Sequence, residues 1–192
     1  MTGASPGPEL HYITARLNAR VQPMDRGDYF EDPLNETLLH EKLGEVTGGG
    51  TQLVDEPAGI DFCELEIALP QMTDDVLRRI IERLEELGAP KGSKLIVEGR
   101  PEISFGVTEG LALFLNGTDL PDEVYENGDV DHVIEECNKL MAPFGQFRGD
   151  WQGSEETGLY FYGSSFSQMQ LAIEPFVASY PLCQKSRIEK IA

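Results

Sequence analysis

The sequence predicts an α+β fold built from two tandem ferredoxin-like repeats, each with the element order β-α-β-β-α-β. Short segments of alternating apolar and polar residues predict the strands, and in each half of the chain two apolar stripes of helical spacing predict helices. Each repeat should form an antiparallel sheet with its helices packed on one face. We expect the repeats at residues 11–98 and 110–192, a disordered tail at 1–10 and a linker at 99–109.

The segment from Asp61 to Val97 is the clearest part of this pattern, and it predicts a strand, a helix and a strand. Thr73 is a suitable N-cap, and the two aspartates after it favour the positive end of the helix dipole. Gly88 supplies the C-terminal stop. The apolar stripe of this helix consists of Leu77, Ile80, Ile81, Leu84 and Leu87.

The other elements of the first repeat are predicted from the same two patterns, the alternation typical of strands and the spacing typical of helices. They are expected as strands at 12–21, 45–54, 60–69 and 95–97 and as a helix at 33–43. Asp32 is expected to cap that helix, with Pro33 at its first position and a loop before it at 22–31. On the helix-free face of the sheet, Arg16 and Arg20 should lie beside Glu64 and Glu66, which is typical of a solvated surface.

The second repeat repeats this order. Its strands are expected at 111–116, 144–152, 157–162 and 187–191, and its helices at 129–140 and 165–176. Asp129 is the predicted cap of the first of these helices. Pro175 lies inside the second and should kink or shorten it, because proline lacks an N–H donor.

The second sheet differs from the first because its strands are apolar on both faces. Leu111, Leu113 and Leu115 form one face of its first strand, and a strand buried on both faces is normally covered on both. The helix-free face should therefore contact the other repeat, a second copy of the chain in a homodimer, or a ligand or protein partner. Its aromatic residues are Phe114, Trp151, Tyr160 and Tyr162.

The chain is strongly acidic, with a formal net charge of −19. Before Gly99 it has 9 basic and 19 acidic residues, and from there on 6 and 15, so the charge is spread over both halves. Such a field disfavours nucleic acid and anionic membranes and attracts basic partners, although it also serves solubility alone. No apolar run approaches the roughly 18 residues that a membrane helix needs.

The three cysteines, Cys63, Cys137 and Cys183, are far apart and show no CxxC spacing. This pattern favours reduced thiols over a disulfide or zinc framework. Residues 1–9 lack the basic residues and the apolar segment of a secretory signal. We therefore expect a cytoplasmic location.

No catalytic or cofactor signature stands in the sequence. His132, Glu135 and Glu136 could meet on one helix face and hold a metal, but the buried side of that helix is defined by apolar neighbours, which favours a solvated face. Gly48–Gly50 lacks the lysine of a phosphate-binding loop and is more typical of an irregular strand. Cys63 and Cys137 fall on core faces, where thiols are poor nucleophiles. We expect no metal, no cofactor and no enzymatic activity.

The stretch from Asp119 to Glu136 contains eight acidic residues and no lysine or arginine. A charge run of this kind is either a solvated surface or an acidic patch that binds a protein. We expect the second, in a non-enzymatic cytoplasmic protein that engages a basic partner; a bacterial antitoxin or immunity-type inhibitor is the most concrete example. The expected contact residues are Asp119, Asp122, Glu123, Tyr125, Glu126 and Asp129. The alternative is a small-molecule sensor or enzyme that uses the aromatic sheet face.

Overall fold

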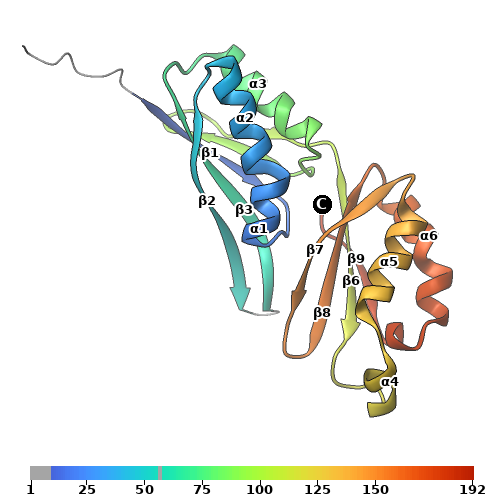
Figure 1. The fold of residues 1–192 in the computed structure, drawn as a ribbon. Helices are drawn as coiled ribbons and strands as arrows, with labels where there is room; N and C mark the ends of the chain where they lie inside the picture. The colour runs from blue at the N-terminus through green and yellow to red at the C-terminus, as the bar shows by residue number, and fades with distance from the viewer. Residues whose placement is uncertain (1–9, 56–57) are drawn as a thin grey trace, which may run out of the picture.

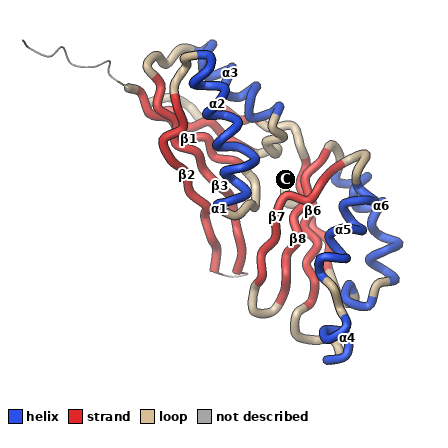
Figure 2. The backbone as a smooth tube through the Cα atoms, viewed as in Figure 1, coloured by secondary structure: helices blue, strands red, loops and turns tan. Residues whose placement is uncertain are grey.

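The structure is a computed structural model that describes residues 10–55 and 58–192. It contains two antiparallel sheets, each with helices on one face (Figures 1 and 2). This confirms the predicted α+β class with two ferredoxin-like repeats. Apart from Leu10, the tail expected at residues 1–10 lies outside the described residues.

The first sheet has the strand order β2-β3-β1-β4-β5. Its strands are β1 (His11–Leu17), β2 (Glu45–Asp55), β3 (Ala58–Leu69), β4 (Ser93–Val97) and β5 (Ile103–Phe105). Its helical segments are α1 (Pro23–Arg26), a π-helical segment (Gly27–Glu31), α2 (Asp32–Glu41) and α3 (Asp74–Glu86). The first four strands have the ferredoxin-like order, and β5 extends the sheet beyond β4.

The second sheet has the order β7-β8-β6-β9. Its strands are β6 (Glu109–Asn116), β7 (Gly145–Gln152), β8 (Glu156–Gly163) and β9 (Arg187–Lys190). Its helices are α4 (Asp122–Asn127), α5 (Val130–Met141) and α6 (Phe166–Ser179), followed by a 3₁₀ turn at Pro181–Cys183. Figure 1 shows α5 and α6 on the face of this sheet that points away from the first repeat.

Helix α3 forms as the sequence predicts. The Thr73 side chain accepts a hydrogen bond from the Val76 amide at 3.3 Å, and Gly88 ends the helix with φ +88°. Leu77, Ile80 and Leu84 are buried against the sheet, as expected for the apolar stripe. On the other sheet face, Arg16 pairs with Glu64 at 2.8 Å, which confirms that solvated pair.

The first helical region begins earlier than predicted. The expected loop at 22–31 is instead α1 and the π-helical segment, which continue without a break into α2. Pro33 explains the widened turn, because its ring crowds the carbonyl four residues earlier and it has no N–H to donate. Arg26 is turned inward here and contacts Glu31 and, at 2.8 Å, the Thr51 hydroxyl.

Three other expectations are corrected. Strand β1 ends at Leu17, because Asn18 leaves the sheet and its amide donates to the Ser93 hydroxyl at 3.1 Å. Arg20 therefore does not lie beside Glu66. The linker at 99–109 contains β5 and the start of β6, and Pro175 neither ends nor shortens α6, which runs to Ser179.

The helix-free face of the second sheet is covered by the first repeat. Ala112, Phe114, Tyr160 and Tyr162 belong to the same buried cluster as the core of the first repeat. The opposite face packs under α5 and α6 in a second cluster with Leu113 and other residues. The two repeats therefore share a core. No helix in the described ranges is long and apolar enough to cross a membrane.

We expect Leu84→Ala to lower the free energy of unfolding by roughly 2–5 kcal/mol, because Leu84 is fully buried between α3 and the sheet. Urea denaturation measures the change. Glu82→Ala on the exposed side of the same helix is the control and should stay within about 0.5 kcal/mol of the parent. Equal effects of the two substitutions would contradict the assigned core face.

Candidate functional site

The acidic stretch forms one exposed surface at the far end of the second repeat, over the β6–α4 loop, α4 and the start of α5. We call this the acidic surface. Its exposed carboxylates belong to Asp119, Asp122, Glu123, Glu126, Asp129, Asp131 and Glu135. Asp129 also caps α5, since its side chain accepts from the His132 amide at 3.1 Å.

None of these carboxylates forms an ion pair with a basic side chain of the described residues. Among the described residues, the only ion pair of the stretch 119–136 joins Glu136 to Lys139. Lys185 is close, but its ammonium donates to the Asp119 backbone carbonyl at 2.8 Å. In the first repeat, by contrast, carboxylates that pair with lysine or arginine include Glu31, Glu41, Glu64, Asp74, Asp75, Glu86 and Glu102. The acidic surface therefore gathers seven exposed carboxylates without an ion-pair partner among the described residues.

The hydroxyl of Tyr125 is hydrogen-bonded within the second repeat. Its hydroxyl accepts from the Leu120 amide at 3.0 Å and lies 3.3 Å from the Asn116 carbonyl oxygen, to which it can donate. The ring packs against the core of the second repeat. The Tyr125 hydroxyl therefore anchors the loop that carries the carboxylates, while the side chain as a whole stays half-exposed.

An apolar groove opens within the acidic surface, between α4 and the turn at Pro181–Cys183. It encloses about 270 Å³ and is lined by Glu123, Val124, Asn127, Gly128, Tyr180, Pro181 and Leu182. Tyr180 stacks on Phe176 with ring centroids 5.3 Å apart, and His132 lies 5.3 Å from Tyr180. The groove therefore lies beside the aromatic side chains of α6 and the start of α5.

The aromatic face of the second sheet meets the segment that follows β1. The Arg20 amide donates to the Tyr162 hydroxyl at 2.8 Å, and the Arg20 guanidinium lies 5.7 Å from the centre of the Tyr160 ring. Phe114, Tyr160 and Tyr162 are buried, so they do not form an open ligand face. Trp151 packs against the same cluster, and its indole N–H is buried without an acceptor in the described part of the chain.

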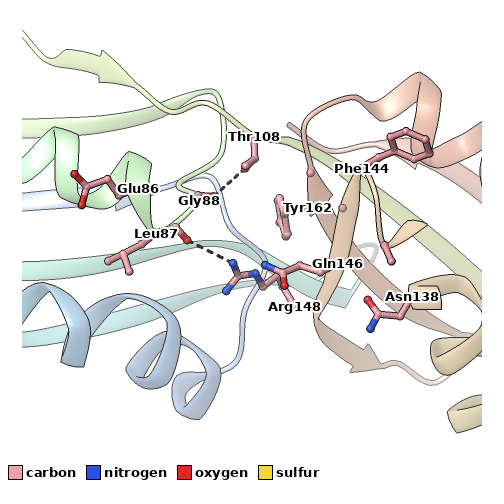
Figure 3. Close-up of a pocket in the computed structure, with 12 residues that line it drawn as sticks. Glu86, Leu87, Gly88, Thr108, Asn138, Phe144, Gln146, Arg148 and Tyr162 are labelled. Atoms are coloured by element: carbon pink, nitrogen blue, oxygen red, sulfur yellow. Dashed lines mark hydrogen bonds between the residues drawn. The ribbon is translucent and has the colours of Figure 1, made fainter. Parts of the chain in front are cut away.

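Two cavities remain at the edges of this contact. The larger, which we call the inter-repeat cleft, encloses about 490 Å³ between the end of α3 and strands β7 and β8 (Figure 3). Its lining includes Glu86, Gly88, Asn138, Gln146, Arg148 and Tyr162. The smaller encloses about 350 Å³ beside Phe114 and Tyr160, and its Arg187 is neutralised by Glu156 at 2.6 Å.

The inter-repeat cleft is lined by one acidic residue, Glu86, and by one basic residue, Arg148. The Cζ atom of Arg148 lies 4.4 Å from the centre of the Tyr29 ring, and Nη2 lies 3.5 Å from the Leu87 carbonyl oxygen (Figure 3). Within residues 10–55 and 58–192, no carboxylate is within ion-pair distance of this side chain. Burial lowers the pKa of Arg148 below its ordinary value, because the charged guanidinium loses hydration.

Two aspartates face each other across the boundary of the repeats near this cleft. The pKa of Asp25 on α1 is raised by burial and by Asp150, and the pKa of Asp150 on β7 is raised by burial and by Asp131. Negative charge therefore extends from Asp131 on α5 through Asp150 to Asp25 in the first repeat. Gln22 holds the two units together here by donating to the Asp150 carbonyl at 3.0 Å.

Glu109 is the main charged junction between the repeats. Its carboxylate accepts from the Phe166 amide at 2.8 Å, from Lys91 of the first repeat at 2.9 Å, and pairs with Lys190 of β9 at 3.2 Å. These donors lower the pKa of Glu109 to about 2, with the Phe166 amide as the largest cause. One carboxylate therefore ties together the first repeat, the start of α6 and the last strand.

The structure brings no catalytic group together from the other sequence candidates. Burial raises the pKa of Cys63 and Cys137 to about 12 and that of Cys183 to about 11, so these thiols are poor nucleophiles at neutral pH. In the described ranges, no three His, Cys, Asp or Glu side chains converge to hold a metal. Gly48–Gly50 lies in β2, where the pairing register shifts between Val46 and Gly48.

Sequence reasoning missed Arg148 and Glu109. Arg148 lies in a strand among polar residues, and Tyr29 and Leu87, which surround it, are far away in sequence. The one signal available was that Arg148 is a rare base in an acidic half. Glu109 lies in the segment that was expected to be a linker, where no hydrophobic periodicity distinguishes it from its neighbours.

No family model matches the chain, and no curated protein sequence matches it. Solved structures resemble its fold at low similarity. An unknown protein from Galdieria sulphuraria is 9% identical with a TM-score of 0.32, over 95% of this chain and 98% of that one. The first two RRM domains of the yeast poly(U)-binding protein are 14% identical with a TM-score of 0.25, over 94% and 99% of the two chains.

The regulatory subunit of aspartate kinase from Thermus flavus is also similar, at 12% identity and a TM-score of 0.29, over 87% of this chain and 93% of that one. These likenesses concern the fold alone. At such scores they carry no argument about a ligand, an activity or a partner of this chain. Its function has to be argued from its own residues.

We expect Glu109→Gln to lower stability at pH 7, with a loss that shrinks as the pH falls. The folded-state pKa of about 2 lies below the ordinary 4.5, so the carboxylate stabilises the fold fully above about pH 4.5 and loses this effect as the pH falls towards 2. Urea unfolding between pH 3 and 7 measures the difference. Glu98→Gln, at an exposed site, is the control; a loss independent of pH would contradict the junction.

Tyr125→Phe is expected to destabilise the protein by about 1 kcal/mol, because the Leu120 amide loses its acceptor. Thermal or urea unfolding of the purified variant reports this change. Tyr12→Phe serves as the matched control, since Tyr12 is 65% exposed. If Tyr125→Phe were as stable as the control, the hydroxyl would not anchor the loop.

Proposed function

We propose that this chain is a non-enzymatic binding protein that engages a basic protein partner through the acidic surface. The observation that carries the proposal is the set of exposed carboxylates without ion pairs in the described residues, gathered around an apolar groove. Unpaired carboxylates reduce the stability of the free protein little while they remain hydrated. They gain favourable Coulomb energy when a cationic surface approaches.

The groove between α4 and the turn at Pro181–Cys183 gives this surface a place for a partner side chain. A lysine or arginine could bury its aliphatic stem against Val124 and Leu182 and leave its charged head beside Glu123. Desolvated contacts of this kind usually carry most of the affinity, whereas rim charges mainly set the association rate.

The remaining features support a binding protein better than an enzyme. The thiols are buried, and the aromatic sheet face is occupied by the first repeat. Three free cysteines also suit a reducing compartment, which favours a cytoplasmic location. An antitoxin or immunity-type inhibitor is the most concrete protein of this description. The aromatic face needs no second copy of the chain to cover it, so we propose no homodimer on this ground.

We expect the double substitution Asp122→Lys with Glu123→Lys to slow association with the partner at least tenfold at low salt. Steering by charge weakens as the Debye length falls from about 30 Å at 0.01 M to about 10 Å at 0.1 M ionic strength, so the parent protein should also bind more slowly at the higher salt. Candidate partners are first identified as proteins that the parent captures from cell extract and the double variant does not. Association and dissociation rates are then measured with the purified pair.

Glu36→Lys with Glu98→Lys is the matched control. Both residues are exposed in the first repeat, and this pair changes the net charge by the same amount. It should leave the association rate within about twofold of the parent. If both double variants slowed binding equally, only the overall charge would matter; if neither did, the acidic surface would be a solvated surface without a partner.

A further inference from the structure

The inter-repeat cleft contains a cation that the protein does not neutralise. The chain has 34 acidic residues, yet Arg148 contacts only an aromatic ring, a backbone carbonyl and a side-chain amide among the described residues. A half-buried guanidinium without a carboxylate partner loses hydration energy that no ion pair replaces. An anion bound in the cleft would supply the missing charge.

The polar atoms left free around Arg148 are hydrogen-bond donors. Asn138 on α5 uses its carbonyl oxygen to accept from the Phe147 amide at 2.9 Å, which leaves its NH₂ group free. Gln146 is best oriented with its oxygen towards Arg148, where it accepts from Nε at 3.0 Å and turns its own NH₂ group away. Nη1 of Arg148 has no acceptor in the described part of the chain.

Two of the acceptors that line the cleft, in contrast, already have donors. The Gly88 carbonyl accepts from the Thr108 hydroxyl at 2.8 Å, as Figure 3 shows, and Glu86 pairs with Arg83 at 3.1 Å. The free hydrogen-bonding capacity therefore favours a ligand that accepts hydrogen bonds. The volume of about 490 Å³ lies within the range typical of small-molecule sites, and Phe144 and Tyr162 offer an apolar wall.

We propose that the inter-repeat cleft binds a small organic anion with a carboxylate or phosphate group, held by Arg148 and by the amides of Asn138 and Gln146. Of the fork of N–H groups on Arg148, Nε and Nη2 are taken by Gln146 and Leu87, and Nη1 is left to donate to either group. Tyr29 and Leu87 fix this fork from the first repeat, while the donors come from the second. The site exists only where the two repeats meet, and it is separate from the acidic surface.

Inorganic phosphate and citrate are the probes, each titrated at constant ionic strength with chloride as the reference anion. Binding is followed by the thermal unfolding midpoint and by the ¹⁵N NMR signal of the Arg148 Nε–H group. We expect saturable changes in both readouts with at least one probe. Phosphate alone would indicate a phosphorylated ligand, and citrate alone a carboxylate ligand.

Arg148→Met should abolish the anion-dependent rise in midpoint, and Arg148→Lys should weaken the apparent affinity at least tenfold because it keeps the charge but loses the fork. Arg78→Met, at a side chain 64% exposed on α3, should behave as the parent. If Arg148→Met does not fold, Asn138→Asp replaces it: this variant keeps the acceptor for Phe147 and puts a negative charge in the cleft, so it should also lose binding.

Two results would overturn the proposal. The first is the absence of any saturable effect of either probe on the parent protein. The second is an equal rise in midpoint for the parent and for Arg148→Met or Asn138→Asp. A loss of stability in Arg148→Met with no anion dependence in the parent would show that Arg148 only caps the carbonyl end of α3.

Discussion

The second sheet is apolar on both faces, and this one constraint determines how the protein is assembled. Helices α5 and α6 cover one face, so Phe114, Tyr160 and Tyr162 need a second cover, which the first repeat supplies. Burying these rings contributes on the order of 25 cal/mol per Å² of apolar surface. The chain after β1 leaves its sheet at Asn18 to reach them, and the inter-repeat cleft results from this meeting.

The charges of the molecule follow the same division. Where the repeats meet, charged groups are few and most are held: Glu109 is bound by three donors, and Arg187 by carboxylates. The exceptions are Arg148 and the two aspartates Asp25 and Asp150. Burial raises the pKa of both aspartates, and so does a neighbouring carboxylate, Asp150 for Asp25 and Asp131 for Asp150. At the free end of the second repeat, the carboxylates of the acidic surface form no ion pairs within the described residues. An acidic chain thus keeps an unneutralised cation at its centre and unneutralised anions at its edge.

Much of the fold could be predicted from the sequence because it depends on the local spacing of apolar residues. Short stretches of sequence were enough to predict the apolar stripe of α3, its N-cap at Thr73 and the strand at Leu111–Leu115, which is apolar on both faces. The prediction failed at residues 23–31, which were expected to be a loop but are helical, with a turn widened before Pro33. It also failed at β5, which is short and shows no alternation of apolar and polar residues. The candidate site was less accessible. The direction of Tyr125 and the surroundings of Arg148 depend on residues that meet only in three dimensions.

The order of the two units along the chain has a consequence for folding during synthesis. Chains leave the ribosome N-terminal end first, at about 5–20 residues per second, and domains generally fold as units. All five strands of the first sheet precede Glu109, so the covering unit can be complete before β6 emerges. The aromatic strands then meet a prepared surface. In a circular permutant with the repeats exchanged, the same strands would emerge uncovered and would be exposed to aggregation while the first sheet was still being made.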